Sequence, residues 1–175
     1  ISLLPEEFEN DSFVEEMWAM KAMEHGEIYF NLLCSVDPNF LRLTPYDDQI
    51  YKEFRQDFPQ LKVELVTDDD LKNPGEKVRW RNFIEKFNKL EDYSYGTLLR
   101  ADATKEFTPE NSILVVRAQF LAIEIARNRE GKNNLIHIPR TSKATKGNPC
   151  PVNHSKNWFL NHFFIKIKST FMQFP

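Results

Sequence analysis

The chain has 175 residues, of which 41% are hydrophobic, 28% charged and 13% aromatic, so it is long enough for one core and too short for two ordinary domains. Its two cysteines, Cys34 and Cys150, are too few for a disulfide framework or for a four-ligand zinc site built from cysteines. No run of about 18 apolar residues is present, so we expect no membrane span.

The charge is divided unevenly along the chain. Residues 1–131 carry 16 Lys and Arg and all 26 Asp and Glu, a balance of −10. Residues 132–175 carry 7 Lys and Arg and no acid, a balance of +7, which leaves the net charge of −3. We therefore predict an N-terminal arm at 1–10, one domain at 11–131, and a basic, acid-free, aromatic tail of irregular structure at 132–175.

Three interpretations of the tail stay open, because residues 158–175 are both basic and strongly aromatic. The first is a segment that binds a membrane surface or nucleic acid. The second is a strand added to the core. The third is an alternative or misassigned terminal coding segment, which the abrupt loss of acids after Gly131 favours.

The first predicted element is a helix from residue 12 to about residue 36. Ser12 and Glu15 have the spacing of a capping box at its start. Asp37-Pro38 stops it, because proline disfavours a helical residue before it. Seven residues recur at spacings of three and four and so share one face: Val14, Trp18, Ala22, His25, Tyr29, Leu32 and Val36.

Two further helices are predicted, over residues 44–58 and 76–88. Thr44 is a capping residue for the first of them, and Pro45 fits its first helical position. Pro59 ends this helix. The apolar faces of the two helices are formed by Ile50, Phe54 and Phe58, and by Trp80, Phe83, Ile84 and Phe87.

In two segments, 61–66 and 93–101, mostly apolar or aromatic residues recur at every second position. This period of two is typical of half-buried strands. We predict that they form a small antiparallel pair. Gly96 lies within the second segment, where it marks a bulge or a close approach of another chain segment. Residues 67–70, with three consecutive aspartates, predict a turn or the start of a short helix.

The last element of the domain is predicted as a central helix that ends at Gly131. Thr108-Pro109 repeats the start signal of residues 44–45. A broad apolar stripe follows, which is typical of a helix packed on more than one side: Ile113, Leu114, Val116, Phe120, Leu121, Ile123 and Ile125. The sequence thus predicts a mainly helical α+β fold, a single compact domain of about four main helices with a small two-stranded antiparallel element.

Candidate catalytic side chains are few. Asp68 and Asp70 have the acid-x-acid spacing that holds a divalent metal in sugar transferases, but they equally suit the first turn of a helix, which we favour. His25 on an apolar face favours a core or boundary histidine, and Cys34 favours a small buried hydrophobe. Phosphate-loop, nucleophile-elbow and zinc-protease motifs are absent. We expect no catalytic residue, no cofactor and no metal.

Four residues of the last helix are candidates for binding a partner: Arg117, Arg127, Asn128 and Arg129. Arg117 interrupts an apolar stripe, so it either forms an internal ion pair, with Asp102 or Glu124, or anchors an acidic or phosphate group of a partner. The internal ion pair is favoured. Arg127 and Arg129 either complement the dipole at a helix end or form a partner site.

Five sequence blocks resemble the polysaccharide biosynthesis domain-containing protein 1 family, over about residues 8–133. They are Trp-Ala-Met-Lys-Ala-Met-Glu-His at 18–25, Ser-Val-Asp-Pro at 35–38, Asp-Asp-Gln-Ile-Tyr at 47–51, Tyr-Gly-Thr-Leu-Leu-Arg at 95–100, and the block at 119–131 that ends Ala-Arg-Asn-Arg-Glu-Gly. The last block is the most specific. The tail departs from the family, since vertebrate relatives typically continue into a hydrophilic extension rich in Lys and Glu.

The resemblance implies a small cytoplasmic protein with no established catalytic site to carry over. For the fungal relatives the implied role is a dedicated chaperone that helps the GTP-binding domain of translation elongation factor 1-alpha to fold as it emerges from the ribosome, and we expect this chain likewise to be a non-enzymatic binding protein. The expected partners are therefore elongation factor 1-alpha and the ribosome–nascent chain. If the four candidate residues bind this client, charge reversal at Arg127 and Arg129 should weaken capture and leave the melting temperature nearly unchanged.

Two other functions are alternatives. An enzyme of polysaccharide synthesis, as the family name implies, would use Asp68 and Asp70 to hold a metal. A nucleic-acid binder would use the tail with its charge of +7, and its binding would depend on salt. The charge of −10 on the domain argues against contact between nucleic acid and the domain itself.

Overall fold

The computed structural model of this chain describes residues 12–137, with side chains from residue 17 onward. Predictions for residues 1–11 and 138–175, including most of the basic tail, lie outside the described residues. The elements are α1 (Ser12–Ser35), the 3-10 helix η2 (Pro38–Phe40), α2 (Asp47–Asp57), α3 (Asp68–Lys72), α4 (Pro74–Glu85), β1 (Gly96–Arg100), β2 (Ser112–Val116) and α5 (Arg117–Arg129).

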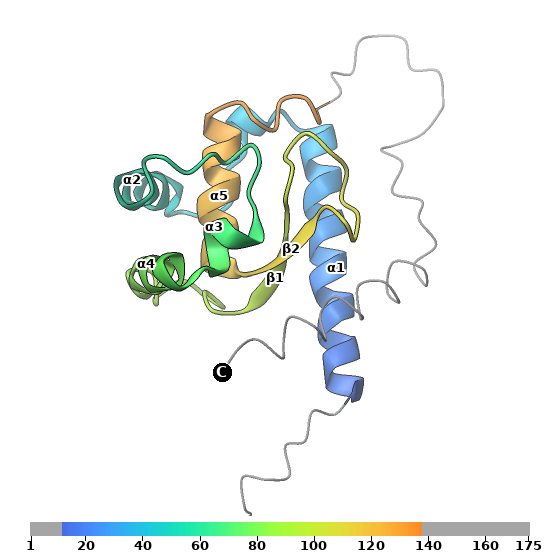
Figure 1. The fold of residues 1–175 in the computed structure, drawn as a ribbon. Helices are drawn as coiled ribbons and strands as arrows, with labels where there is room; N and C mark the ends of the chain where they lie inside the picture. The colour runs from blue at the N-terminus through green and yellow to red at the C-terminus, as the bar shows by residue number, and fades with distance from the viewer. Residues whose placement is uncertain (1–11, 138–175) are drawn as a thin grey trace, which may run out of the picture.

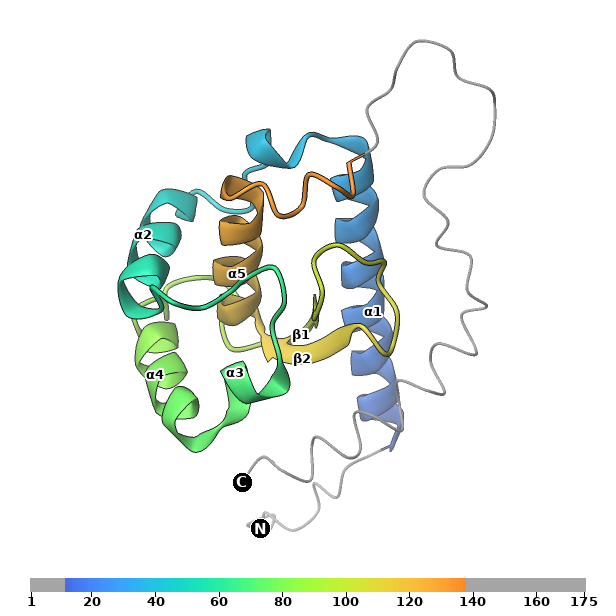
Figure 2. The same ribbon diagram turned by 45° about the horizontal axis from the view of Figure 1, so that its top comes forward.

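The elements form layers around a two-stranded sheet (Figure 1). The long helix α1 lies on one side of the strands, and α5 lies on the other side (Figure 2). Helices α2 and α4 pack on α5 from outside. Because α5 is covered on several sides, its residues 118–128 are all buried. The predicted α+β, mainly helical fold with a central last helix is confirmed.

The helices begin where local side chains satisfy free backbone groups. The Asp47 carboxylate at the start of α2 accepts hydrogen bonds from the backbone N–H of Leu43 at 2.9 Å and of Thr44 at 2.7 Å. Thr67 and Asp70 form a reciprocal capping box at α3, and Asn73 caps α4 through its side-chain oxygen. The structure thus contains the predicted helices, with α4 beginning two residues earlier than predicted. Tyr46 precedes α2 without a side-chain cap, so the capping role predicted for Thr44 is wrong.

The predicted strand partner was wrong. Strand β1 pairs antiparallel with β2, with Leu98 opposite Leu114. Residues 61–66 contribute only an isolated bridge between Leu65 and Asp102. The alternation at 61–66 has another cause: Val63 and Val66 anchor a loop in the core while Leu65 is exposed.

Strand β2 was predicted as the first turns of the last helix. Its residues Ile113-Leu114-Val115-Val116 form a continuous apolar run, because one face of the sheet packs on α1 and the other on the main core. Such a run does not distinguish a buried strand from a buried helix. The signal at Thr108 marks a turn instead, in which the Thr108 hydroxyl accepts a hydrogen bond from the Asn111 N–H at 3.2 Å.

The core between α2 and α4 is aromatic. Phe58 stacks on Trp80 with ring centroids 4.1 Å apart, and Phe54 and Phe83 complete the cluster. All four side chains are at most 2% exposed. Contacts of this kind add to the free energy of burial, so the cluster fixes the outer helices against α5.

Candidate functional site

Arg127 lies in the interior of the protein. Its guanidinium donates to the Val63 carbonyl at 2.6 Å, to the Glu124 carboxylate at 2.7 Å and to the Ala101 carbonyl at 3.1 Å. The side chain is fully buried. It therefore joins α5 to two loops, so we now expect reversal of its charge to lower the melting temperature.

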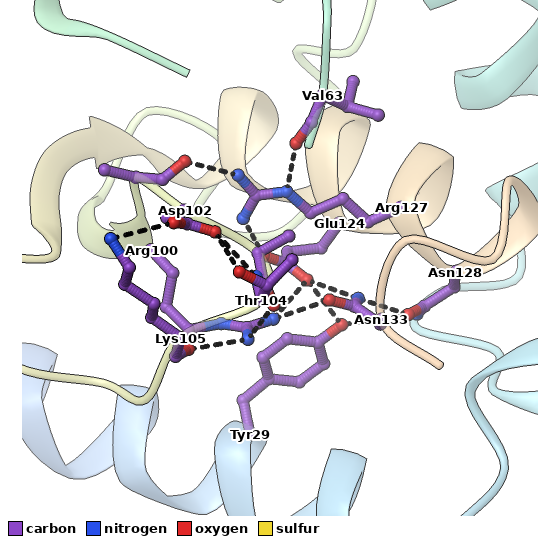
Figure 3. A network of polar contacts seen from close by, with 12 residues as sticks. Tyr29, Val63, Arg100, Asp102, Thr104, Lys105, Glu124, Arg127, Asn128 and Asn133 are labelled. Carbon is purple, nitrogen blue, oxygen red and sulfur yellow. Dashed lines mark hydrogen bonds and ion pairs between the residues drawn. The ribbon is translucent and has the colours of Figure 1, made fainter. Parts of the chain in front are cut away.

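Arg127 is part of a larger set of buried polar side chains, which we call the polar network (Figure 3). Its members come from α1, β1, α5 and the segment after α5: Tyr29, Arg100, Glu124, Arg127, Asn128 and Asn133. Glu124 is the central acceptor. It takes hydrogen bonds from Tyr29 at 3.1 Å and Asn133 at 2.9 Å, and Arg100 lies 3.6 Å away.

Asn128 and Asn133 complete the polar network. The Asn128 amide donates to the Tyr29 hydroxyl at 3.3 Å, and its oxygen accepts from the Asn133 amide at 2.6 Å. Arg100 donates to the Asn133 side-chain oxygen at 2.6 Å. Asn133 is fully buried, so the described fold continues past Gly131, where we placed the domain boundary.

The electrostatics of the polar network favour an ionised Glu124. Burial by itself would raise the pKa of Glu124, but the charges of Arg127 and Arg100 and the hydrogen bonds from Asn133 and Arg127 outweigh it and hold the pKa below its ordinary value. Burial, followed by the charge of Glu124, raises the pKa of Tyr29 well above its ordinary value. Fully bonded buried ions of this kind hold segments of the fold in place.

Arg117 and Arg129 are nearer the surface. Arg129 donates to the Asp48 carboxylate at 2.5 Å and lies over the Tyr51 ring at 5.0 Å from its centroid. The predicted ion pair of Arg117 with Asp102 or Glu124 is not formed. Among residues 17–137, the Arg117 side chain has no hydrogen bond or ion pair, and its charge lowers the pKa of His25 after the larger effect of burial.

The other sequence candidates have local partners. Asp70 accepts from the Thr67 backbone at 2.8 Å and from its hydroxyl at 2.7 Å, and Asp68 pairs with Lys72. These contacts are those of a helix start. His25 lies 3.2 Å from the Thr97 hydroxyl and edge-on to the Phe120 ring. Within the described part of the chain, no three His, Cys, Asp or Glu residues are placed to share a metal ion.

A surface feature that sequence reasoning missed is the outer face of α1. Five apolar residues have exposed side chains and form what we call the α1 stripe: Met17, Met20, Ile28, Leu32 and Val36 at the helix end. The exposed charged residues Lys21 and Glu24 interrupt it between Met20 and Ile28. Leu32 and Val36 were assigned to the same face as buried Tyr29, but they are 37% and 39% exposed. The signal was present in the sequence, because α1 is apolar on more than one face.

A groove along β2 is the second surface feature. It has a volume of about 650 Å³ and opens between Trp18 of α1 and Trp80 of α4. Gly96 lies beside it, where an added Cβ would come within 2.4 Å of the Trp18 ring. The close approach predicted at Gly96 is therefore present, and it allows the indole to form one wall of the groove.

Comparisons with known proteins agree on one family. The family described as PBDC1 protein matches residues 14–138. The Homo sapiens Protein PBDC1 is 50% identical over 139 residues, which are 79% of this chain and 60% of the human protein. The Saccharomyces cerevisiae Protein PBDC1 homolog is 45% identical over 128 residues, or 70% of this chain and 88% of the yeast protein. The chain thus spans less than two thirds of its human relative.

The fold is also similar to a solved structure. A solution NMR structure of a Saccharomyces cerevisiae protein matches with a TM-score of 0.67 and 43% sequence identity. The match covers 77% of this chain and 95% of the yeast protein. No helix among the described residues is both long enough and apolar enough to cross a membrane.

Proposed function

Since this chain belongs to the PBDC1 protein family, we propose that it is a non-enzymatic binding protein that assists the folding of the GTP-binding domain of translation elongation factor 1-alpha in the cytoplasm. A folding factor of this kind covers apolar segments of its client until the client can bury them. The client and the ribosome–nascent chain are its partners in this proposal.

The observation that carries the proposal is the α1 stripe. It extends over about 28 Å of helix, since residues 17–36 rise about 1.5 Å each. Ile28 is 62% exposed at its centre, and two methionines provide flexible apolar contacts that adapt to different client surfaces. Ile28, Leu32 and Val36 follow one another at four-residue steps, so a partner protein can bury these exposed apolar side chains together.

The basic candidates take a smaller part in this proposal. Arg117 and Arg129 remain within reach of a partner, whereas Arg127 and Asn128 are buried and bonded inside the protein. Arg127 and Asn128 therefore act on client capture only through the fold. The client surface that we propose consists of the α1 stripe, with Arg117 as an accessible cation on α5.

The test compares two variants of the full chain in a translating lysate. Ile28→Glu places a charge in the α1 stripe, and Gln56→Glu places the same charge at an exposed polar position of α2. We expect Ile28→Glu to reduce capture of newly made elongation factor 1-alpha several-fold and Gln56→Glu to leave it unchanged. Both variants should melt like the parent. Equal capture by Ile28→Glu and the parent would refute the proposal.

A further inference from the structure

The α1 stripe runs past a cysteine that is already bonded. Cys34 lies on α1 between Leu32 and Val36, and its side chain is partly buried against the cluster that contains Phe30. Cys34 is disulfide-bonded. The sequence has one other cysteine, Cys150, so within a single chain that residue is the one available partner.

The distance from Cys34 to the centre of the α1 stripe is short. Ile28 lies six residues before Cys34, which corresponds to about 9 Å along the helix axis and about 120° around it. On a helix about 11 Å wide, this separation is about 15 Å across the surface. Residues 151–157 span up to about 23 Å when extended. A chain held at Cys34 by its residue 150 therefore reaches Ile28 with Trp158.

Residues 158–175 have a composition that favours burial against another surface. Ten of these eighteen residues are large and apolar, and six of the ten are aromatic. The α1 stripe offers a matching apolar surface, since Ile28 is 62% exposed and Leu32 and Val36 follow it at four-residue steps. Contact between the two surfaces removes apolar area of both from water, which is favourable.

The charges on the two surfaces are opposite. Glu24 lies one turn before Ile28 and Glu27 directly before it, against one cation, Lys21. Neither carboxylate forms an ion pair with another residue of 17–137. The segment 150–175 carries three lysines and no acid. Electrostatic attraction therefore favours this segment on the exposed face of α1.

We propose that Cys34 and Cys150 form a reversible disulfide that holds the aromatic segment 158–175 on the α1 stripe. The consequence for client capture rests on the proposed function: the oxidised chain covers the client surface with its own C-terminal segment, and the reduced chain exposes that surface. The disulfide and the covering are properties of this chain alone.

The disulfide forms by exchange with a small-molecule disulfide such as oxidised glutathione. The thiolate of one cysteine attacks a sulfur of the oxidant and releases one glutathione thiolate. The thiolate of the other cysteine then attacks the mixed disulfide and releases the second. The two cysteines lose two protons and two electrons, and the oxidant accepts the electrons. Reduced glutathione reverses both steps, since disulfides of cytoplasmic proteins are typically transient.

Peptide mapping tests the disulfide. The full chain is equilibrated with oxidised and reduced glutathione, its free thiols are alkylated, and it is digested without reduction for mass spectrometry. We expect the peptide that contains Cys34 to be joined to the peptide that contains Cys150, in a monomeric chain. A bond from Cys34 to glutathione alone or to a second copy, or two alkylated cysteines, would overturn the proposal.

A photoreactive residue in place of Ile28 tests the covering of the α1 stripe. We expect crosslinks to residues 158–175 in the oxidised chain and several-fold fewer after reduction or in Cys150→Ser. The matched control places the same group at Val78 of α4, which is also apolar and is 57% exposed, and should give no crosslink to this segment. Crosslinks from position 28 that are equal before and after reduction, or that are absent from both, would overturn the proposal.

Capture in a translating lysate without added thiol measures the consequence. The oxidised parent should capture newly made elongation factor 1-alpha several-fold less than Cys150→Ser, and equal capture would overturn the covering of the client surface. Absence of the disulfide and the crosslink in a chain that captures the client would refute this proposal alone. Presence of both, with no capture by the parent or by Cys150→Ser, would refute the proposed function alone.

Discussion

Replacement of Arg127 by methionine tests whether the polar network holds the fold together. Methionine keeps much of the length of the side chain but removes every hydrogen-bond donor. The Val63 carbonyl loses a hydrogen bond of 2.6 Å, and the Glu124 carboxylate loses one of 2.7 Å. The Ala101 carbonyl keeps its bond from the Val66 N–H at 2.9 Å.

The expected loss of stability depends on the partners that Glu124 keeps after the substitution. Removal of one member of a buried ion pair costs about 3–5 kcal/mol. Arg100 remains 3.6 Å from Glu124, and Asn133 and Tyr29 still donate to the carboxylate, so the carboxylate keeps a counter-ion. We therefore expect the free energy of unfolding to fall by about 3 kcal/mol, the low end of this range. For a domain of this size that corresponds to a melting temperature lower by roughly 12 °C.

The assay is thermal and urea unfolding of the full chain, followed by circular dichroism. Arg129→Met is the matched control, because it removes the same group two residues along α5 at a position paired only at the surface. We expect its melting temperature to stay close to that of the parent. A melting temperature of Arg127→Met equal to that of Arg129→Met would refute the reasoning.

Three further changes test the polar network and the groove. Tyr29→Phe removes a hydroxyl that bonds Glu124, and we expect a loss of about 1–2 kcal/mol in urea unfolding; no loss would contradict a role for this bond. The lowered pKa of Glu124 gives stability that is present above its ordinary value of 4.5 and lost as the pH falls through the lower folded value. The free energy of unfolding of Glu124→Gln should therefore be lower than that of the parent at pH 7 and should fall less steeply as the pH is lowered. Parallel profiles of unfolding free energy against pH for the two proteins would disprove this. Gly96→Ala should displace the Trp18 ring and shift its fluorescence, whereas Gly75→Ala, whose nearest neighbour is 3.4 Å away, should leave the spectrum unchanged.

Local signals in the sequence identified most of the helices, although the last helix was predicted to begin where β2 lies. The spacing from Thr67 to Asp70 and the Asn-Pro pair at 73–74 are short-range capping signals, and both operate in the structure as hydrogen bonds within a few residues. The apolar residues at four-residue steps in α2 likewise identified a buried face, since Ile50 and Phe54 are both buried. Such features need only the neighbouring chain, so they can be read without the fold.

The sheet required tertiary information. Residues 61–66 and 112–116 both carry apolar residues that a strand accepts. Only the packing of α1 and α5 on opposite faces decides that Ile113 and Leu114 belong to β2. The sequence pattern of a strand does not show which segments cover the two faces of the sheet. The pattern therefore led to the wrong partner for β1.

The roles of the arginines were decided by tertiary structure for the same reason. Arg127 and Arg129 are two residues apart on α5, so they point in different directions. Arg127 points toward Glu124 and two loop carbonyls, and Arg129 points toward Asp48 at the surface. The sequence by itself determined that this helix carries cations at its end. The fold determined which cation is interior, because burial depends on what the neighbouring loops bring to each face.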